Sequence, residues 1–186
     1  MGYIQGSIKK YLNDLSARTP APGGGSAAAL SAAMAAGLVA MACQFTLGKE
    51  KYKGFQARCR RILRESLKTK DKLSRLADAD VKAYKSRDLD QAIRVPAEVC
   101  VLSCRIMESG AEVLEKGNKI LASDALLGVL LAGVSFSAGL MYVEVNLKYA
   151  KDKAKKYLKL YKNLINMLPK TQRIIKKVEV HFGDLA

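Results

Sequence analysis

Apolar residues recur along the whole chain at intervals of three and four, which is the period of an α-helix. The first example is the run Ile4, Ile8, Tyr11, Leu12 and Leu15. No segment of useful length alternates between apolar and polar residues, as a half-buried strand would. Because 49% of the 186 residues are hydrophobic, one substantial core can be buried. We therefore predict a single all-α domain over residues 1–186, a helical bundle of about five to six helices with long antiparallel helices.

Helix-capping residues and prolines set the predicted boundaries. Ser26 is a good N-cap for the second helix, and Gly48 suits its end. Pro96 is expected to bend or interrupt the fourth helix. Pro169 is expected to stop the fifth helix, which itself is expected to break near Asn146. The predicted helices cover about residues 4–15, 26–47, 55–86, 88–116, 123–168 and 171–182.

Two predicted helices are almost free of polar side chains. Residues 27–43 and 125–143 carry no charge and approach the length that spans a membrane. Both are rich in alanine and glycine, which give little drive into lipid and let helices approach closely. We expect these helices at the centre of a bundle or at a subunit interface, and hence a homodimer that is not inserted in a membrane.

Cysteine usage and the N-terminal sequence indicate the compartment. The four cysteines have no CxxC spacing and there is one histidine, so neither a zinc site nor a disulfide framework is predicted. The first 16 residues lack an apolar core of signal-peptide length. We expect reduced core thiols in a cytoplasmic protein without a bound metal.

The net charge of +15 is concentrated in two segments. Residues 49–75 carry eleven basic and three acidic side chains, and residues 148–177 carry eleven and one. Such segments favour an anionic partner, or are simply the solvated faces of helices. They have little aromatic interleaving and no known binding motif, which does not favour nucleic acid. A basic helical binding module is the alternative from a different functional class.

The loop RTPAPGGGS, residues 18–26, precedes the most alanine-rich helix. Glycines that open a helix expose amide N–H groups at the positive end of the helix dipole, where a carboxylate or phosphate binds. The loop lacks the GK[ST] ending of a Walker loop and the strand that precedes a dinucleotide fingerprint. It is therefore either an anion site or a plain turn with a serine cap.

Two aspartates are candidates for proton transfer. Asp80 falls on the apolar stripe of the third helix between Ala77 and Tyr84, so its carboxyl group is predicted to point inward. Burial raises a carboxyl pKa, as general acid–base catalysis near neutrality requires, but an inward aspartate can also pair with a lysine or cap a neighbouring helix. Asp124 opens the fifth helix, where an acid stabilises the first turn without any catalytic role.

Six segments together resemble a known family. They are ARTPAPGGGSAAALSAAMAAGLVAMA, GKEKYKG, DADVKAY, the VP pair at residues 95–96, GNKILASDALLGVLLAG and VNLKYAKD. In this order, over residues 4–162, they are similar to the cyclodeaminase domain of formiminotransferase-cyclodeaminase and its stand-alone bacterial relatives, which include methenyltetrahydrofolate cyclohydrolases. The resemblance implies a cytosolic, dimeric, all-helical enzyme that acts on tetrahydrofolate derivatives without a metal or other cofactor.

The resemblance also implies which residues form the site. Asp80 is expected to carry the proton, with Asp124 as the second choice, and Arg18, Lys49 and Lys51 are expected to bind the tail of one or several glutamates. The other expected substrate-binding residues are Gly23, Gly24, Gly25, Ser26, Tyr84, Asn118, Ser123 and Asn146. The chain departs from the family pattern at Tyr142, where an asparagine is frequent, and at residues 119–122, where a proline–asparagine turn is usual. Both departures bear on the shape of the pocket near Asn146.

Two reactions fit this resemblance. Cyclodeaminases convert 5-formiminotetrahydrofolate to 5,10-methenyltetrahydrofolate and ammonia, and cyclohydrolases open the methenyl bridge with water to give 10-formyltetrahydrofolate. Both pass through related tetrahedral species at one carbon, so the residues alone do not separate them. We favour the cyclodeaminase, and keep the cyclohydrolase as the alternative.

Overall fold

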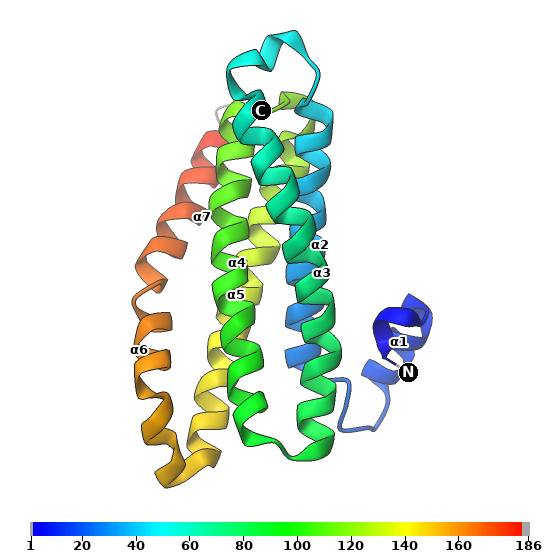
Figure 1. The fold of residues 1–186 in the computed structure, drawn as a ribbon, viewed down its shortest axis with the longest axis vertical. Helices are drawn as coiled ribbons and strands as arrows, with labels where there is room; N and C mark the ends of the chain where they lie inside the picture. The colour runs from blue at the N-terminus through cyan, green and yellow to red at the C-terminus, as the bar shows by residue number, and fades with distance from the viewer. Residues whose placement is uncertain (1, 184–186) are drawn as a thin grey trace.

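The computed structural model describes residues 2–183, and its core is a bundle of four long helices. These are α2 (Gly24–Thr46), α3 (Gln56–Ser86), α4 (Leu89–Lys116) and α5 (Ala122–Ala150). They run alternately up and down, and α3 and α4 lie in front of α2 and α5 in Figure 1. Residues 2–183 contain no strand, so the prediction of an all-α bundle is confirmed.

Shorter elements flank this bundle. Near the N-terminus, α1 packs beside the lower part of α3, and α6 and α7 cover the other side of the bundle (Figure 1). These shorter elements are η1 (Tyr3–Gln5), α1 (Ile8–Ser16), η2 (Glu50–Phe55), η3 (Lys119–Leu121), η4 (Lys151–Tyr157), α6 (Leu158–Ile165) and α7 (Leu168–Gly183).

Small residues bring the four long helices close together. Ala29, Ala32, Ala35 and Ala36 of α2 are completely buried in the main core. A second apolar cluster, which includes Phe136, joins α4 and α5 to η4 and α6. The four cysteines are all buried and unpaired, as expected for core thiols.

Two segments are long and apolar enough to cross a membrane, judged by length and composition alone. They are Gly24–Thr46 and Lys119–Ala150, and 61% and 50% of their most apolar windows are buried in the bundle. Much of the remaining surface of α2 and α5 is also apolar. It forms one stripe along each helix, and the two helices pack against each other. We call these stripes the α2–α5 face; its exposed members are Met34, Phe45, Leu127, Val134, Met141 and Val145.

Three boundary predictions were wrong. Ser26 is not an N-cap, because α2 begins at Gly24 and Gly23 takes the capping position. The fifth helix breaks at Lys151, whose φ of 49° is left-handed, and not near Asn146. Pro169 does not stop a helix; it lies in the first turn of α7, where a missing N–H costs nothing. Pro96 lies within α4 without interrupting it.

Candidate active site

The glycine loop places the first turn of α2 against α1 and α3. Ser26 lies in that turn with no exposed surface, and the Tyr11 hydroxyl of α1 donates to its Oγ at 3.3 Å. The Ser26 backbone N–H is one of the first amides of the helix and therefore has no partner within α2. It donates to the carboxylate of Asp80, on α3. The anion at this helix N-terminus is thus the protein's own side chain.

Asp80 can approach α2 this closely only because residue 25 is a glycine. A Cβ at Gly25 would fall within 3 Å of the Asp80 carboxyl carbon and both oxygens. Burial raises the pKa of Asp80 above its ordinary value, and the hydrogen bond from the Ser26 N–H opposes part of that rise. Asp80 therefore caps α2, as one of the two alternatives predicted, and is also a carboxyl group with an elevated pKa.

A cavity of about 310 Å³ opens directly beside Asp80. Its other walls come from the glycine loop and from Tyr142, Asn146 and Tyr149 at the C-terminal end of α5. The Tyr142 hydroxyl lies against Gly24, where a Cβ would overlap it. Tyr142 and Tyr149 were not among the predicted site residues, although their spacing with Asn146 places all three near one face of α5.

Asn146 is anchored to the neighbouring helix. Its Nδ2 donates to the backbone carbonyl of Ala92, on α4, at 2.6 Å. Asn146 and Ala92 both line the cavity that contains Asp80. The side chain therefore has a fixed orientation at the wall of the cavity.

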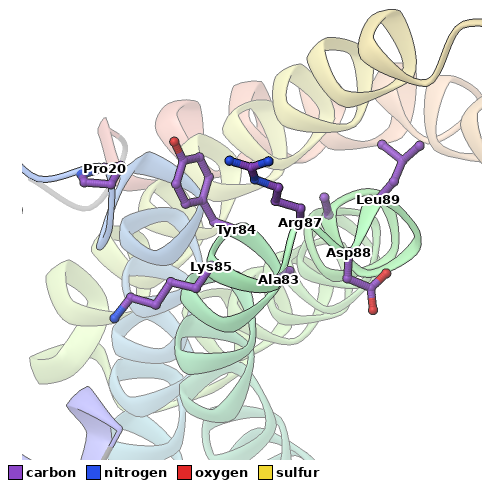
Figure 2. Close-up of a pocket in the computed structure, with 8 residues that line it drawn as sticks. Pro20, Ala83, Tyr84, Lys85, Arg87, Asp88 and Leu89 are labelled. Carbon is purple, nitrogen blue, oxygen red and sulfur yellow. The ribbon is translucent and has the colours of Figure 1, made fainter.

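A second, more open cavity of about 580 Å³ adjoins the first and shares Pro20, Ala83, Tyr84 and Ala92 with it. Figure 2 shows the guanidinium of Arg87 directed toward the Tyr84 ring, whereas Lys85 and Asp88 point away. Tyr84 is 59% exposed, so it lies at the rim and not in the core stripe on which it was placed.

Arg87 is a further site residue that sequence reasoning missed. It ends α3 in the left-handed conformation, with φ 53° and ψ 32°, which is uncommon for a residue other than glycine. Among residues 2–183, no carboxylate forms an ion pair with it. Arg87 follows the last turn of α3, so the helical spacing of apolar residues, which identifies the faces of a helix, could not have predicted its place in the site.

The predicted site residues divide between the two ends of the bundle. Gly23–Gly25, Asp80, Tyr84 and Asn146 line the same cavity at one end, and Arg18 lies exposed two residues before Pro20 of its wall. Lys49 and Lys51 lie at the opposite end, in the segment that joins α2 to α3 (Figure 1). Ser123 and Asp124 open α5 at that same end. Since Asp124 and Asn146 are 22 residues apart on one helix, they are separated by about 33 Å.

Asn118 has a structural task at this far end. Its backbone N–H donates to Thr46 Oγ1 at 2.9 Å, and its Nδ2 donates to the Phe45 carbonyl at 3.0 Å. Its Oδ1 accepts from the Ile120 N–H and the Tyr52 hydroxyl. Asn118 therefore ties the end of α2 to the start of α5, and it does not reach the cavity beside Asp80 within one chain.

The arrangement defines an all-helical protein in which a half-buried carboxyl group with a raised pKa lines a small cavity beside tyrosine rings, and an exposed arginine lines the adjoining cavity. Such a cavity suits a flat, polar small molecule that needs a proton moved. Comparisons with known proteins identify the family.

The family model of formiminotransferase-cyclodeaminase matches residues 7–162, so the chain belongs to that family, as the sequence motifs predicted. A methenyltetrahydrofolate cyclohydrolase of Methylorubrum extorquens is 32% identical over 171 residues, which cover 80% of this chain and 82% of that protein. A formimidoyltransferase-cyclodeaminase of Dictyostelium discoideum is 30% identical, and the match spans 78% of this chain but only 30% of that protein.

A solved structure has the same fold. The formiminotetrahydrofolate cyclodeaminase of Thermotoga maritima superimposes with a TM-score of 0.81 at 26% identity, and the match covers 97% of this chain and 96% of that one. The helical bundle is therefore shared over its whole length with a protein of similar size.

Proposed function

We propose that this protein is a folate one-carbon enzyme, a formiminotetrahydrofolate cyclodeaminase that forms 5,10-methenyltetrahydrofolate and ammonia. The observation that carries the proposal is the half-buried Asp80 carboxyl group, which lies between Gly25 and a cavity lined by Tyr142 and Asn146. The relatives named above are, by their names, enzymes that act on tetrahydrofolate derivatives.

Asp80 suits the proton transfers of this reaction. Starting from the amidinium form of the substrate, N10 attacks the formimino carbon and a new C–N bond forms. Asp80 accepts the N10 proton and then delivers it to the amino group, which leaves as ammonia when its C–N bond breaks. One carboxyl group thus takes up and returns one proton, and its raised pKa makes the carboxylate a stronger base for the first of these transfers. Holding N10 against the carbon contributes further, because the ring closure is intramolecular.

Arg87 suits the glutamate tail of folate. Its side chain lines the more open cavity that adjoins the Asp80 cavity and has no carboxylate partner among the described residues. Its guanidinium can bind a carboxylate through two parallel hydrogen bonds. Arg18 lies in the adjoining loop and is a second candidate. Lys49 and Lys51 contribute only if a second copy of the chain brings them to this end.

A cytoplasmic homodimer through the α2–α5 face is part of the proposal. The exposed residues of this face are 38–66% exposed and none is charged. The chain has 10684 Å² of accessible surface, whereas about 8,800 Å² is expected for a compact monomer of 20.2 kDa. A twofold axis across antiparallel helices would place the far end of one copy beside the Asp80 end of the other. Asp124 and Ser123 of one copy would then lie near the Asp80 cavity of the second copy.

The methenyltetrahydrofolate cyclohydrolase activity is the second candidate, and the 32% identical relative of Methylorubrum favours it. In that reaction water attacks the same carbon, and Asp80 would take one proton from the water. The N5–C bond then breaks as Asp80 gives this proton to N5, and the second proton of the water is released to solvent. Incubation of the purified protein with each folate separates the two. Methenyl absorbance that grows from the formimino substrate supports the cyclodeaminase, and methenyl absorbance that only disappears supports the cyclohydrolase.

The variant Asp80→Asn tests the role of the carboxyl group. The amide oxygen of asparagine can still accept the Ser26 N–H, so the fold should persist, while turnover should fall by about 100-fold or more. Light scattering at the same time tests the dimer. A mass of one chain would overturn the α2–α5 pairing, and unchanged turnover would remove Asp80 from the mechanism.

A further inference from the structure

Pro96 lies in the interior of α4, where a proline removes a hydrogen bond. It has no backbone N–H, so the carbonyl four residues earlier loses its usual partner in the helix. That carbonyl belongs to Ala92. Pro96 is buried, and Gly139 of α5 lies so close that a Cβ there would meet the Pro96 carbonyl at 2.9 Å. Helices α4 and α5 therefore approach closely at this point.

The carbonyl that Pro96 frees is the one that Asn146 binds. Asn146 Nδ2 reaches Ala92 O at 2.6 Å from α5, 54 residues away in sequence. A carbonyl oxygen can only accept, so it must be the NH₂ group of Asn146 that faces α4. The amide oxygen Oδ1 then faces the other way. No donor among residues 2–183 reaches Oδ1, and Asn146 lines the same cavity as Asp80.

We propose that Pro96 is a positioning residue: by freeing the Ala92 carbonyl, it fixes the Asn146 amide with Oδ1 presented to the cavity as an acceptor for an N–H group of the bound pterin. This inference rests on the proposed function for the identity of the ligand. Asn146 and Asp80 then divide two tasks across the cavity. Asn146 accepts a hydrogen bond from an N–H group of the ligand without taking its proton, whereas Asp80 takes and returns a proton.

An acceptor fixed in this way would also make the site selective for ligands that carry an N–H group at the matching position. A site that offers a fixed acceptor to a substrate N–H discriminates against compounds that lack the donor, because the acceptor is then left without a partner. Without Pro96, an N–H at position 96 would compete for the Ala92 carbonyl and draw it back toward the helix axis. The Asn146 amide would then be free to turn over and present NH₂ to the ligand.

The test compares Pro96→Ala, Asn146→Ala and the double variant, with Pro169→Ala as the control because Pro169 lies exposed in the first turn of α7. In Pro96→Ala the value of kcat/KM for the formimino substrate should fall by about 2- to 13-fold, which is the worth of one neutral hydrogen bond. The thermal unfolding midpoint should rise, since α4 gains a hydrogen bond. In the Asn146→Ala background the change at Pro96 should have no further effect on kcat/KM.

Opposite changes of activity and stability, with no added effect in the double variant, support a positioning role. A parallel loss of both, or additive losses, would overturn it, because a proline that only packs would behave in that way. Slow hydrogen exchange of the Asn146 side-chain amide, lost in Pro96→Ala and kept in Pro169→Ala, gives a readout that needs no turnover. If that exchange result holds while the wild-type protein forms no methenyl product, the proposed function fails and the orientation of Asn146 stands. Equal exchange in all three proteins would refute the orientation itself.

Discussion

The substitution Gly25→Ala tests whether the position of Asp80, and not only its presence, matters. A methyl group at residue 25 would overlap the carboxyl carbon and both oxygens of Asp80. Residue 25 lies in the first turn of α2 with ordinary helical geometry, so alanine is compatible with the backbone there. The overlap can be relieved only if the Asp80 side chain turns away, which breaks its hydrogen bond to the Ser26 N–H.

The expected effect on stability is small because two terms oppose each other. Overpacking of this kind costs about 1–3 kcal/mol. Replacing a helical glycine by alanine returns about 1 kcal/mol. The free energy of unfolding should therefore fall by about 0–2 kcal/mol. Turnover should fall far more, by about 100-fold, because the displaced carboxyl group no longer reaches the reacting nitrogen atoms.

Gly133→Ala is the matched control. A Cβ at Gly133 of α5 would meet Ile175 Cδ1 at 2.8 Å, which is a comparable overlap but with the tip of a flexible side chain far from the cavity. Both variants are assayed by methenyl formation and by denaturant unfolding. Gly133→Ala should lose a similar small amount of stability and keep its turnover. Wild-type turnover in Gly25→Ala would refute the argument that the glycine is needed to admit Asp80.

Three further predictions follow from the buried polar groups. Burial holds the pKa of Asp80 above its unfolded value, so the wild-type protein loses stability as pH rises from the unfolded-state pKa of this group to its folded-state pKa. Asp80→Asn should gain stability relative to wild type over that rise in pH, as seen in denaturant midpoints, and a reversed trend would contradict the assignment. Burial raises the pKa of the Cys100 thiol to about 12, and all four thiols are buried, so a thiol reagent should label the native protein far more slowly than the unfolded one. Tyr11→Phe removes the donor to Ser26 Oγ and should lower the free energy of unfolding, measured by denaturant titration, by about 0.5–1.5 kcal/mol. Unchanged turnover would show that the phenylalanine ring still packs as the tyrosine ring does.

The fold could be read from the sequence because α3 and α4 each have an apolar stripe, α2 and α5 are apolar almost throughout, and clear breaks separate the helices. The errors came where tertiary contacts replace local signals. Ser26 looked like an N-cap, but α2 starts two residues earlier, and the Ser26 amide in its first turn donates to Asp80 from another helix. The break at Lys151 has no glycine or proline to mark it.

The site was predictable helix by helix but not as an assembly. The stripe on α3 placed Asp80 inward, and its half-buried position beside the cavity agrees with that inference. Periodicity gives the faces of one helix and says nothing about which helix ends meet. Asp124 was therefore grouped with Asp80, although the antiparallel order of the helices places the two at opposite ends of one chain.

Asp80 both accepts a hydrogen bond at the start of α2 and lines the cavity, so it links the stability of the bundle to the chemistry of the cavity. A carboxylate at the N-terminus of a helix is stabilised by the dipole and by the amide it accepts, which alone would lower its pKa. Burial is the larger effect here and raises the pKa. The amide keeps the carboxyl group in place while burial keeps its proton affinity high, so the same contact at the start of α2 also holds the proposed proton carrier beside the cavity. An aspartate that only capped the helix would have no need of a cavity on its other side, and that cavity is what distinguishes Asp80 from an ordinary capping residue.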